Sequence, residues 1–161
     1  MRHLHNWFNN LKISQNYSKA LNSFKIQKII NEFDARIRNP SNYSLKWTFL
    51  SAHDTDLSAA QLDLNISSPQ CIEDLYRKGS TTALVCDANT EYAASMIFEL
   101  HSDNEKDFYV KLRNNGKYVY LCAQKSESCN YTDWKNRAKK IIISNASEVC
   151  GASVSNKQYL I

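Results

Sequence analysis

The sequence predicts an α/β fold, on three observations. Apolar residues recur at helical spacing over 18–38, which predicts an amphipathic helix that ends before Pro40, because the residue before a proline avoids the α region. The apolar run 45–52 does not alternate cleanly with polar residues, which predicts a buried, parallel strand. The runs 93–100 and 108–112 are typical of strands and are separated by a short polar loop, which predicts a hairpin.

A helix is expected directly after the strand 45–52. Asp54 or Thr55 can cap it, and Asp56 falls in the first turn, where the helix dipole favours negative charge. The other expected elements, in chain order, are a helix over 1–11, an irregular stretch over 67–89, a turn at Asn115-Gly116 leading into a strand over 118–121, and a helix over 132–142.

Size and charge exclude several classes of protein. The 161 residues suit one domain, and the formal net charge of +4 is only mildly basic. We interpret the cluster of Lys135, Arg137, Lys139 and Lys140 as a solvated helix face, so no nucleic-acid partner is expected. No apolar run approaches the roughly 20 residues that cross a bilayer, so no membrane span is expected.

The cysteines and the glycosylation sequons indicate a secretory protein. The five cysteines show no CxxC zinc spacing, which favours disulfides and an oxidising compartment, and their odd number leaves one without a partner. Residues 1–12 have no continuous apolar core and do not form a signal peptide. These features together lead us to expect the back part of a longer protein. The Asn-x-Ser/Thr sequons, which are weak evidence alone, lie at Asn16, Asn42, Asn65, Asn130 and Asn145.

His53 and Asp54 stand where the expected strand meets the expected helix. A helix N-terminus offers unpaired N–H groups and partial positive charge to an anion, and a protonated imidazole beside it can bind a phosphate oxygen. A neighbouring carboxyl can protonate a leaving alkoxide, and negative charge from phosphate and Asp56 is expected to raise its pKa towards that role. Taken alone, the pair has a simpler interpretation, a histidine at a strand end followed by a helix cap.

Four segments, in order, resemble histidine acid phosphatases of the histidine phosphatase superfamily. Segment 49–57 (FLSAHDTDL) is similar to the strand-to-helix segment of that family, which carries Ser-Ala-His-Asp-Thr. Segment 92–100 (YAASMIFEL) resembles a strand that ends in Glu-Leu, and segment 108–114 (FYVKLRN) resembles its partner strand. Cys122 and Cys129, followed by YTDW, resemble the late cysteine loop before the last helix. The four segments cover roughly residues 20–145.

The resemblance implies the C-terminal part of a histidine-phosphatase-like sandwich, with a mixed sheet flanked by helices and incomplete in this chain. The domain is expected over 1–147 and a tail over 148–161. The implied reaction is phosphomonoester hydrolysis through a phosphohistidine, with His53 binding the phosphate and Asp54 donating a proton to the leaving group. Neither a metal nor an organic cofactor is expected. The implied location is secreted, lysosomal or vacuolar, with a signal peptide in a missing N-terminal part.

The sequence departs from the family in one major respect. The Arg-His-Gly-x-Arg-x-Pro motif that carries the nucleophile is absent, and His3 lacks the required neighbours. We therefore expect no catalysis by the chain alone. The other class that remains open is an inactive fragment or pseudophosphatase that binds phosphorylated ligands or a partner. The expected partners are a phosphate monoester and, as an option, a second copy in a homodimer.

The remaining expectations concern the cysteines and the end of the strand 93–100. Two disulfide pairings are hypothesised, Cys122 with Cys129 and Cys71 with Cys86, which leaves Cys150 without a partner in the chain. His101 is expected at the surface, and Glu99 is expected to form hydrogen bonds at the edge of the core rather than to face the site.

Overall fold

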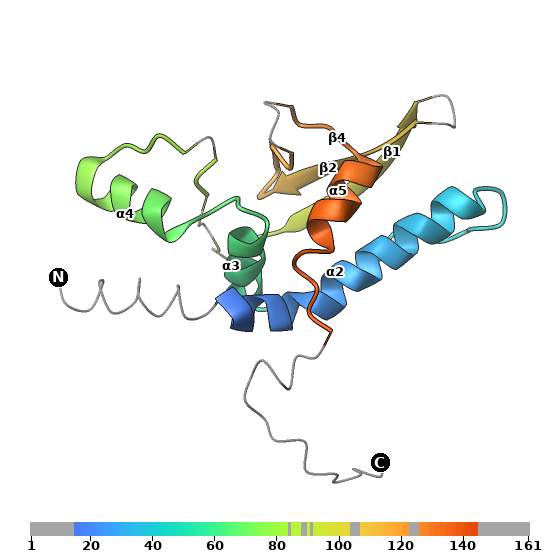
Figure 1. The fold of residues 1–161 in the computed structure, drawn as a ribbon, viewed down its shortest axis with the longest axis horizontal. Helices are drawn as coiled ribbons and strands as arrows, with labels where there is room; N and C mark the ends of the chain where they lie inside the picture. Colours follow the sequence, from blue (N-terminus) through green and yellow to red (C-terminus); the bar gives the residue numbers. More distant parts are fainter. Residues whose placement is uncertain are drawn as a thin grey trace, which may run out of the picture.

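A computed structural model of the chain describes residues 15–83, 85–87, 90, 92–103, 107–122 and 126–144. These residues form a mixed α/β fold with an open antiparallel sheet (Figure 1). In chain order the elements are α2 (Gln15–Arg38), α3 (Asp54–Asp63), α4 (Pro69–Lys78), β1 (Met96–Asp103), β2 (Asp107–Asn114), β3 (Lys117–Val119), β4 (Cys129–Asn130) and α5 (Tyr131–Ala138).

The sheet is built around β2. Strand β1 pairs with it along its whole length, from Met96 opposite Asn114 to Asp103 opposite Asp107, so the expected hairpin is confirmed. Strands β3 and β4 both pair with β2, at different points along it. The turn between β2 and β3 is the expected Asn115-Gly116, with φ angles of 49° and 81°, which suits a type I′ hairpin turn.

Alternation along β2 separates a buried face from an exposed one. Val110, Leu112 and Asn114 point to the buried side, whereas Lys111 and Arg113 point away from it. Helices α2 and α5 lie side by side on the buried face (Figure 1). The core between these elements joins residues from α2, the sheet, α5 and the turn after it: Ile26, Ile30, Val110, Cys129, Tyr131, Trp134, Ala138 and Ile141.

Helix α2 confirms the expected helix over 18–38. Its Ile26 and Ile30 are almost fully buried, one turn apart, and Phe33 completes the same face. The Phe33 ring lies 5.7 Å from the Trp134 ring of α5, measured between centroids, and Phe98 of β1 lies 5.9 Å from it on another side. Trp134 therefore joins both layers of the fold.

Within the described residues, two expectations about secondary structure are wrong and a third is confirmed only in part. Segment 45–52 forms neither helix nor strand, and every pairing in the described sheet is antiparallel, so the parallel strand and the mixed sheet are not found. The stretch 67–89 was expected to be irregular but contains α4, which lies away from the sheet beyond α3 (Figure 1). The expected helix over 132–142 ends earlier, at Ala138, and continues as a turn. The expected helix over 1–11 lies outside the described residues.

None of the described helices is both long and apolar enough to cross a membrane.

Candidate functional site

His53 is the residue at which segment 44–52, which forms neither helix nor strand, gives way to helix α3. Its backbone is extended (φ −89°, ψ 168°), and its carbonyl accepts hydrogen bonds from the N–H groups of Asp56 and Leu57. Its own N–H donates to Asp56 Oδ2 over 3.0 Å, the reciprocal half of a capping box. The cap is therefore His53 with Asp56, not Asp54 or Thr55 as expected. This arrangement fixes the backbone of His53 and the direction in which α3 begins.

Polar contacts with α2 hold α3 in place. Lys25 Nζ lies 2.6 Å from Asp56 Oδ1, and Asp63, at the other end of α3, accepts hydrogen bonds from Ser18 and Asn22, each over 2.7 Å. The Lys25 ammonium, followed by the His53 N–H, holds the pKa of the Asp56 carboxyl below its usual value. Burial raises the pKa of the Asp63 carboxyl, although its hydrogen bonds from Asn22 and Ser18 oppose the shift.

His53 and Asp54 are both exposed to solvent. Their side chains are therefore accessible to a ligand in bulk water. The helix N-terminus beside them is not vacant, however, because Thr55 N–H donates to Asp54 Oδ1 over 2.8 Å. The nearby charge of Asp56 is paired with Lys25. An anion at this helix end thus competes with the Asp54 carboxylate for N–H groups.

The segment that leads to His53 is the most exposed apolar part of the described chain. Trp47 and Phe49 are 68% and 88% exposed, and Leu45 and Leu50 are about half exposed. Two hollows elsewhere, one of them about 450 Å³ and lined by Asp63, Trp134 and Arg137 among others, do not include His53 or Asp54. The described structure therefore presents the His-Asp pair on an open surface.

Sequence reasoning missed a charged network on the exposed face of the sheet. Glu99 Oε1 pairs with Arg113 Nε over 2.7 Å, and Glu99 Oε2 is 2.8 Å from His101 Nε2 and accepts from Tyr118 OH over 3.1 Å. Burial acts to raise the pKa of Glu99, but the hydrogen bonds from His101 and Tyr118 and the charge of Arg113 outweigh it and lower the pKa. Glu99 thus serves hydrogen bonding within the sheet, as expected, and His101 is half-exposed beside it.

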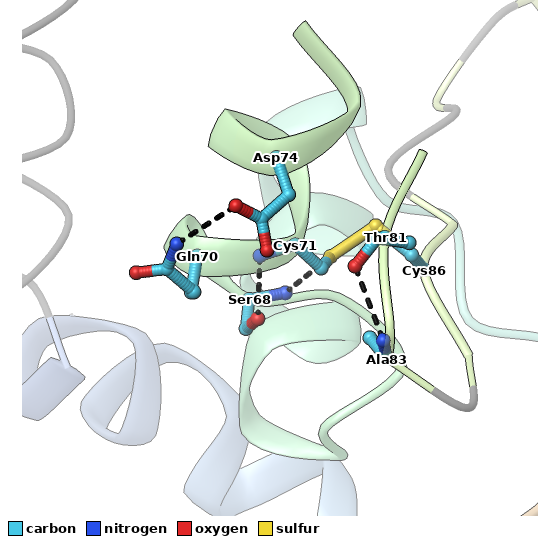
Figure 2. The surroundings of a disulfide bond; sticks show 7 residues. All are labelled: Ser68, Gln70, Cys71, Asp74, Thr81, Ala83 and Cys86. Carbon is cyan, nitrogen blue, oxygen red and sulfur yellow. Dashed lines mark hydrogen bonds between the residues drawn. A yellow bond between two sulfur atoms is a disulfide. The ribbon is translucent and has the colours of Figure 1, made fainter. Parts of the chain in front are cut away.

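The structure places both hypothesised cysteine pairs at disulfide distance. Cys71 and Cys86 have Cα atoms 5.8 Å apart, and Cys122 and Cys129 have Cα atoms 5.6 Å apart, both inside the range of protein disulfides. Figure 2 shows that the first disulfide joins the start of α4 to the segment after it. The pairs are consistent with an oxidising compartment. Cys150 and His3 lie outside the described residues.

Within the described residues, no group of three or more histidine, cysteine, aspartate or glutamate side chains is arranged to hold a metal ion.

No family model, no curated protein and no solved structure matches this chain. The likeness to histidine acid phosphatases therefore rests on the four sequence segments alone.

Proposed function

We propose that this chain supplies the phosphate-binding histidine and the proton-donating aspartate of an acid phosphatase of the histidine type. The observation that carries the proposal is the position of His53 and Asp54. Both are exposed, adjacent and located at the first turn of a ten-residue helix whose start is fixed by Asp56. The order of the sequence segments around them adds support.

The proposed roles follow from ordinary acid–base chemistry. A protonated His53 donates a hydrogen bond to a phosphate oxygen and offsets its charge. A protonated Asp54 gives its proton to the ester oxygen as the bond from that oxygen to phosphorus breaks, so the alcohol leaves neutral. The nucleophile that receives the phosphoryl group is the histidine of Arg-His-Gly-x-Arg-x-Pro, which these 161 residues do not contain.

The proposed role of Asp54 is that of a general acid. Its carboxylate accepts the Thr55 N–H over 2.8 Å, and its acid form is the one that can give a proton to the ester oxygen. Acid conditions therefore suit the proposed reaction. The two disulfides fit a secreted protein or one of the lysosome or vacuole.

A second candidate is an inactive member that only binds phosphorylated ligands. The observation in its favour is the missing nucleophile motif. The two candidates share His53 as the phosphate ligand, but only the first gives Asp54 a proton to donate.

Calorimetric titration with inorganic phosphate tests the phosphate site. Near pH 5 we expect His53→Ala to weaken phosphate binding about 10-fold or more, the loss of one charge-assisted hydrogen bond, whereas the matched control His101→Ala leaves binding unchanged. Near pH 7.5, Asp54→Asn is expected to strengthen binding because it removes the competing charge. Equal losses of phosphate affinity in the two histidine variants would refute the proposal.

An assay of p-nitrophenyl phosphate near pH 5 tests the division of roles. The chain alone is expected to show no turnover. Robust hydrolysis that survives His3→Ala but is lost in Asp54→Ala would show that the nucleophile lies within these 161 residues and has been misassigned.

A further inference from the structure

The turn that follows α2 contains the sequon Asn42-Tyr43-Ser44, called here the turn sequon. The N–H groups of Asn42 and Tyr43 both donate to the Asn39 carbonyl, over 3.3 and 3.0 Å. Arg36 Nη1 donates to the Tyr43 carbonyl over 3.0 Å. Among the described residues, no hydrogen bond involves the Asn42 or Ser44 side chain, so the turn is held without them.

Both side chains that define the turn sequon are accessible. Asn42 and Ser44 are exposed, and the residue between them is not proline, which the sequon excludes. The turn lies at the outer end of α2, drawn in cyan in Figure 1, whereas Lys25 in the first half of α2 contacts α3. Lys25 and Arg38 are about 20 Å apart along the helix axis. The turn sequon is therefore well separated from the start of α3 at His53.

Two other sequons have their hydroxyl groups buried. The sequon at Asn16 has the same three residue types as the turn sequon, Asn-Tyr-Ser, but its Ser18 is only 3% exposed and donates to Asp63 over 2.7 Å. In the sequon at Asn65, Ser67 is also 3% exposed. A glycan is bulky and belongs on the surface, and a buried sequon is out of reach of a transferase once the chain has folded. These two sequons are open to modification only before folding.

The sequon at Asn130 is exposed but has a structural role. The Asn130 side-chain oxygen accepts the Thr132 N–H over 2.9 Å and caps α5. The sequon at Asn145 lies outside the described residues. Among the sequons that the structure describes, the turn sequon is thus the one with an exposed asparagine, an exposed hydroxyl and no part in the fold.

We propose that Asn42 carries an N-linked glycan, in preference to the asparagines of the two buried sequons. The donor is an oligosaccharide joined to a lipid through pyrophosphate. Asn42 Nδ2 forms a bond to the anomeric carbon of the sugar and loses one proton, while the bond from that carbon to the pyrophosphate oxygen breaks and the lipid pyrophosphate leaves. The two disulfides support the passage through an oxidising secretory compartment that this transfer needs, and the proposal is independent of the phosphate site.

Translation of the whole chain into microsomes, behind a cleavable signal sequence, tests the proposal. Treatment with peptide-N-glycosidase in heavy-oxygen water converts each glycosylated asparagine to a labelled aspartate, which peptide mass spectrometry locates. We expect label at Asn42, and we expect Ser44→Ala to abolish it. Ser41→Ala, a matched change of an exposed serine in the same turn, is expected to leave the label unchanged. A chain without label at Asn42 would overturn the proposal.

The buried sequons give an internal comparison. Under oxidising conditions we expect the occupancy of Asn42 to exceed that of Asn16 several-fold, although both stand in Asn-Tyr-Ser. A reductant that prevents the Cys71–Cys86 disulfide delays folding, so it is expected to raise the occupancy of Asn16 and Asn65 while that of Asn42 stays the same. Equal occupancy of Asn16 and Asn42 under both conditions would show that exposure does not select the site, and would refute the preference for Asn42.

Discussion

Replacing Asp56 by alanine removes the residue that fixes the start of α3. Its carboxylate accepts the N–H of His53, contributes negative charge at the helix N-terminus and pairs with Lys25. Loss of a capping side chain costs about 1 kcal/mol, and loss of the favourable dipole contact costs about 0.5 kcal/mol. The ion pair adds about 0.5 kcal/mol. The value is modest because solvent still reaches both side chains, which are 27% and 21% exposed, and screens their charges.

We therefore expect Asp56→Ala to lower the free energy of unfolding by about 2 kcal/mol at pH 7, measured by urea titration with circular dichroism. The matched variant Lys25→Met removes only the ion pair and is expected to cost about 0.5 kcal/mol. Because the pKa of Asp56 is lowered in the folded chain, its contribution is complete above the unfolded value of 3.8 and decreases as the pH falls below it. Equal losses in the two variants would refute the capping role of Asp56.

Three further predictions concern the elements that frame the site. Removing the disulfide with Cys71→Ala and Cys86→Ala, which are 15 residues apart, is expected to cost about 3 kcal/mol in urea unfolding, and a loss below about 1 kcal/mol would contradict the pairing. The raised pKa of Asp63 means that the folded chain holds the proton of this carboxyl more tightly than the unfolded chain does, so the free energy of unfolding decreases as the pH rises above 3.8 through the folded pKa. Asp63→Asn is expected to remove that part of the pH dependence of unfolding. An unchanged pH dependence would argue against this role of Asp63. Gly79→Ala is expected to lower the free energy of unfolding by about 1 kcal/mol, because φ is +68° at the end of α4 although nothing within 4 Å obstructs a Cβ atom. Gly79→Asn is expected to cost less. A stabilising alanine would show that this backbone conformation is not maintained.

Local patterns predicted the elements that depend on local interactions. The period of apolar residues gives α2, and the Asn115-Gly116 turn gives the β2–β3 connection, because each is decided by neighbours in the sequence. Helix α4 also has local signals, a Ser68 cap, Pro69 in the first turn and Gly79 after the end, so the sequence does mark this helix within the stretch expected to be irregular.

The strand expected at 45–52 shows the limit of such patterns. The sequence has the composition of a buried strand, but a strand exists only with a partner, and the described residues provide none. A pattern of apolar residues indicates that a segment is buried in its native setting, but it does not identify the residues that bury it.

The site was predictable in position but not in detail. The start of a helix directly after His53 follows from local pattern, and the structure has it there, although the strand expected before it is absent from the described residues. The pairing of Asp56 with Lys25, 31 residues earlier, depends on how α3 packs on α2. The contact of Glu99 with Arg113 depends on the register of β1 and β2, which places Arg113 opposite Ile97. Neither contact has a signature in the sequence.

If His53 binds phosphate, its ring signals respond to the ion, and an NMR titration measures that response. The ring signals of His53 and His101 are followed in the same spectra while inorganic phosphate is added near pH 5. We expect a saturable shift of the His53 signals, with those of His101 unchanged because that ring is held by Glu99 on the sheet. His53 signals that do not move, or that move only as those of His101 do, would contradict it.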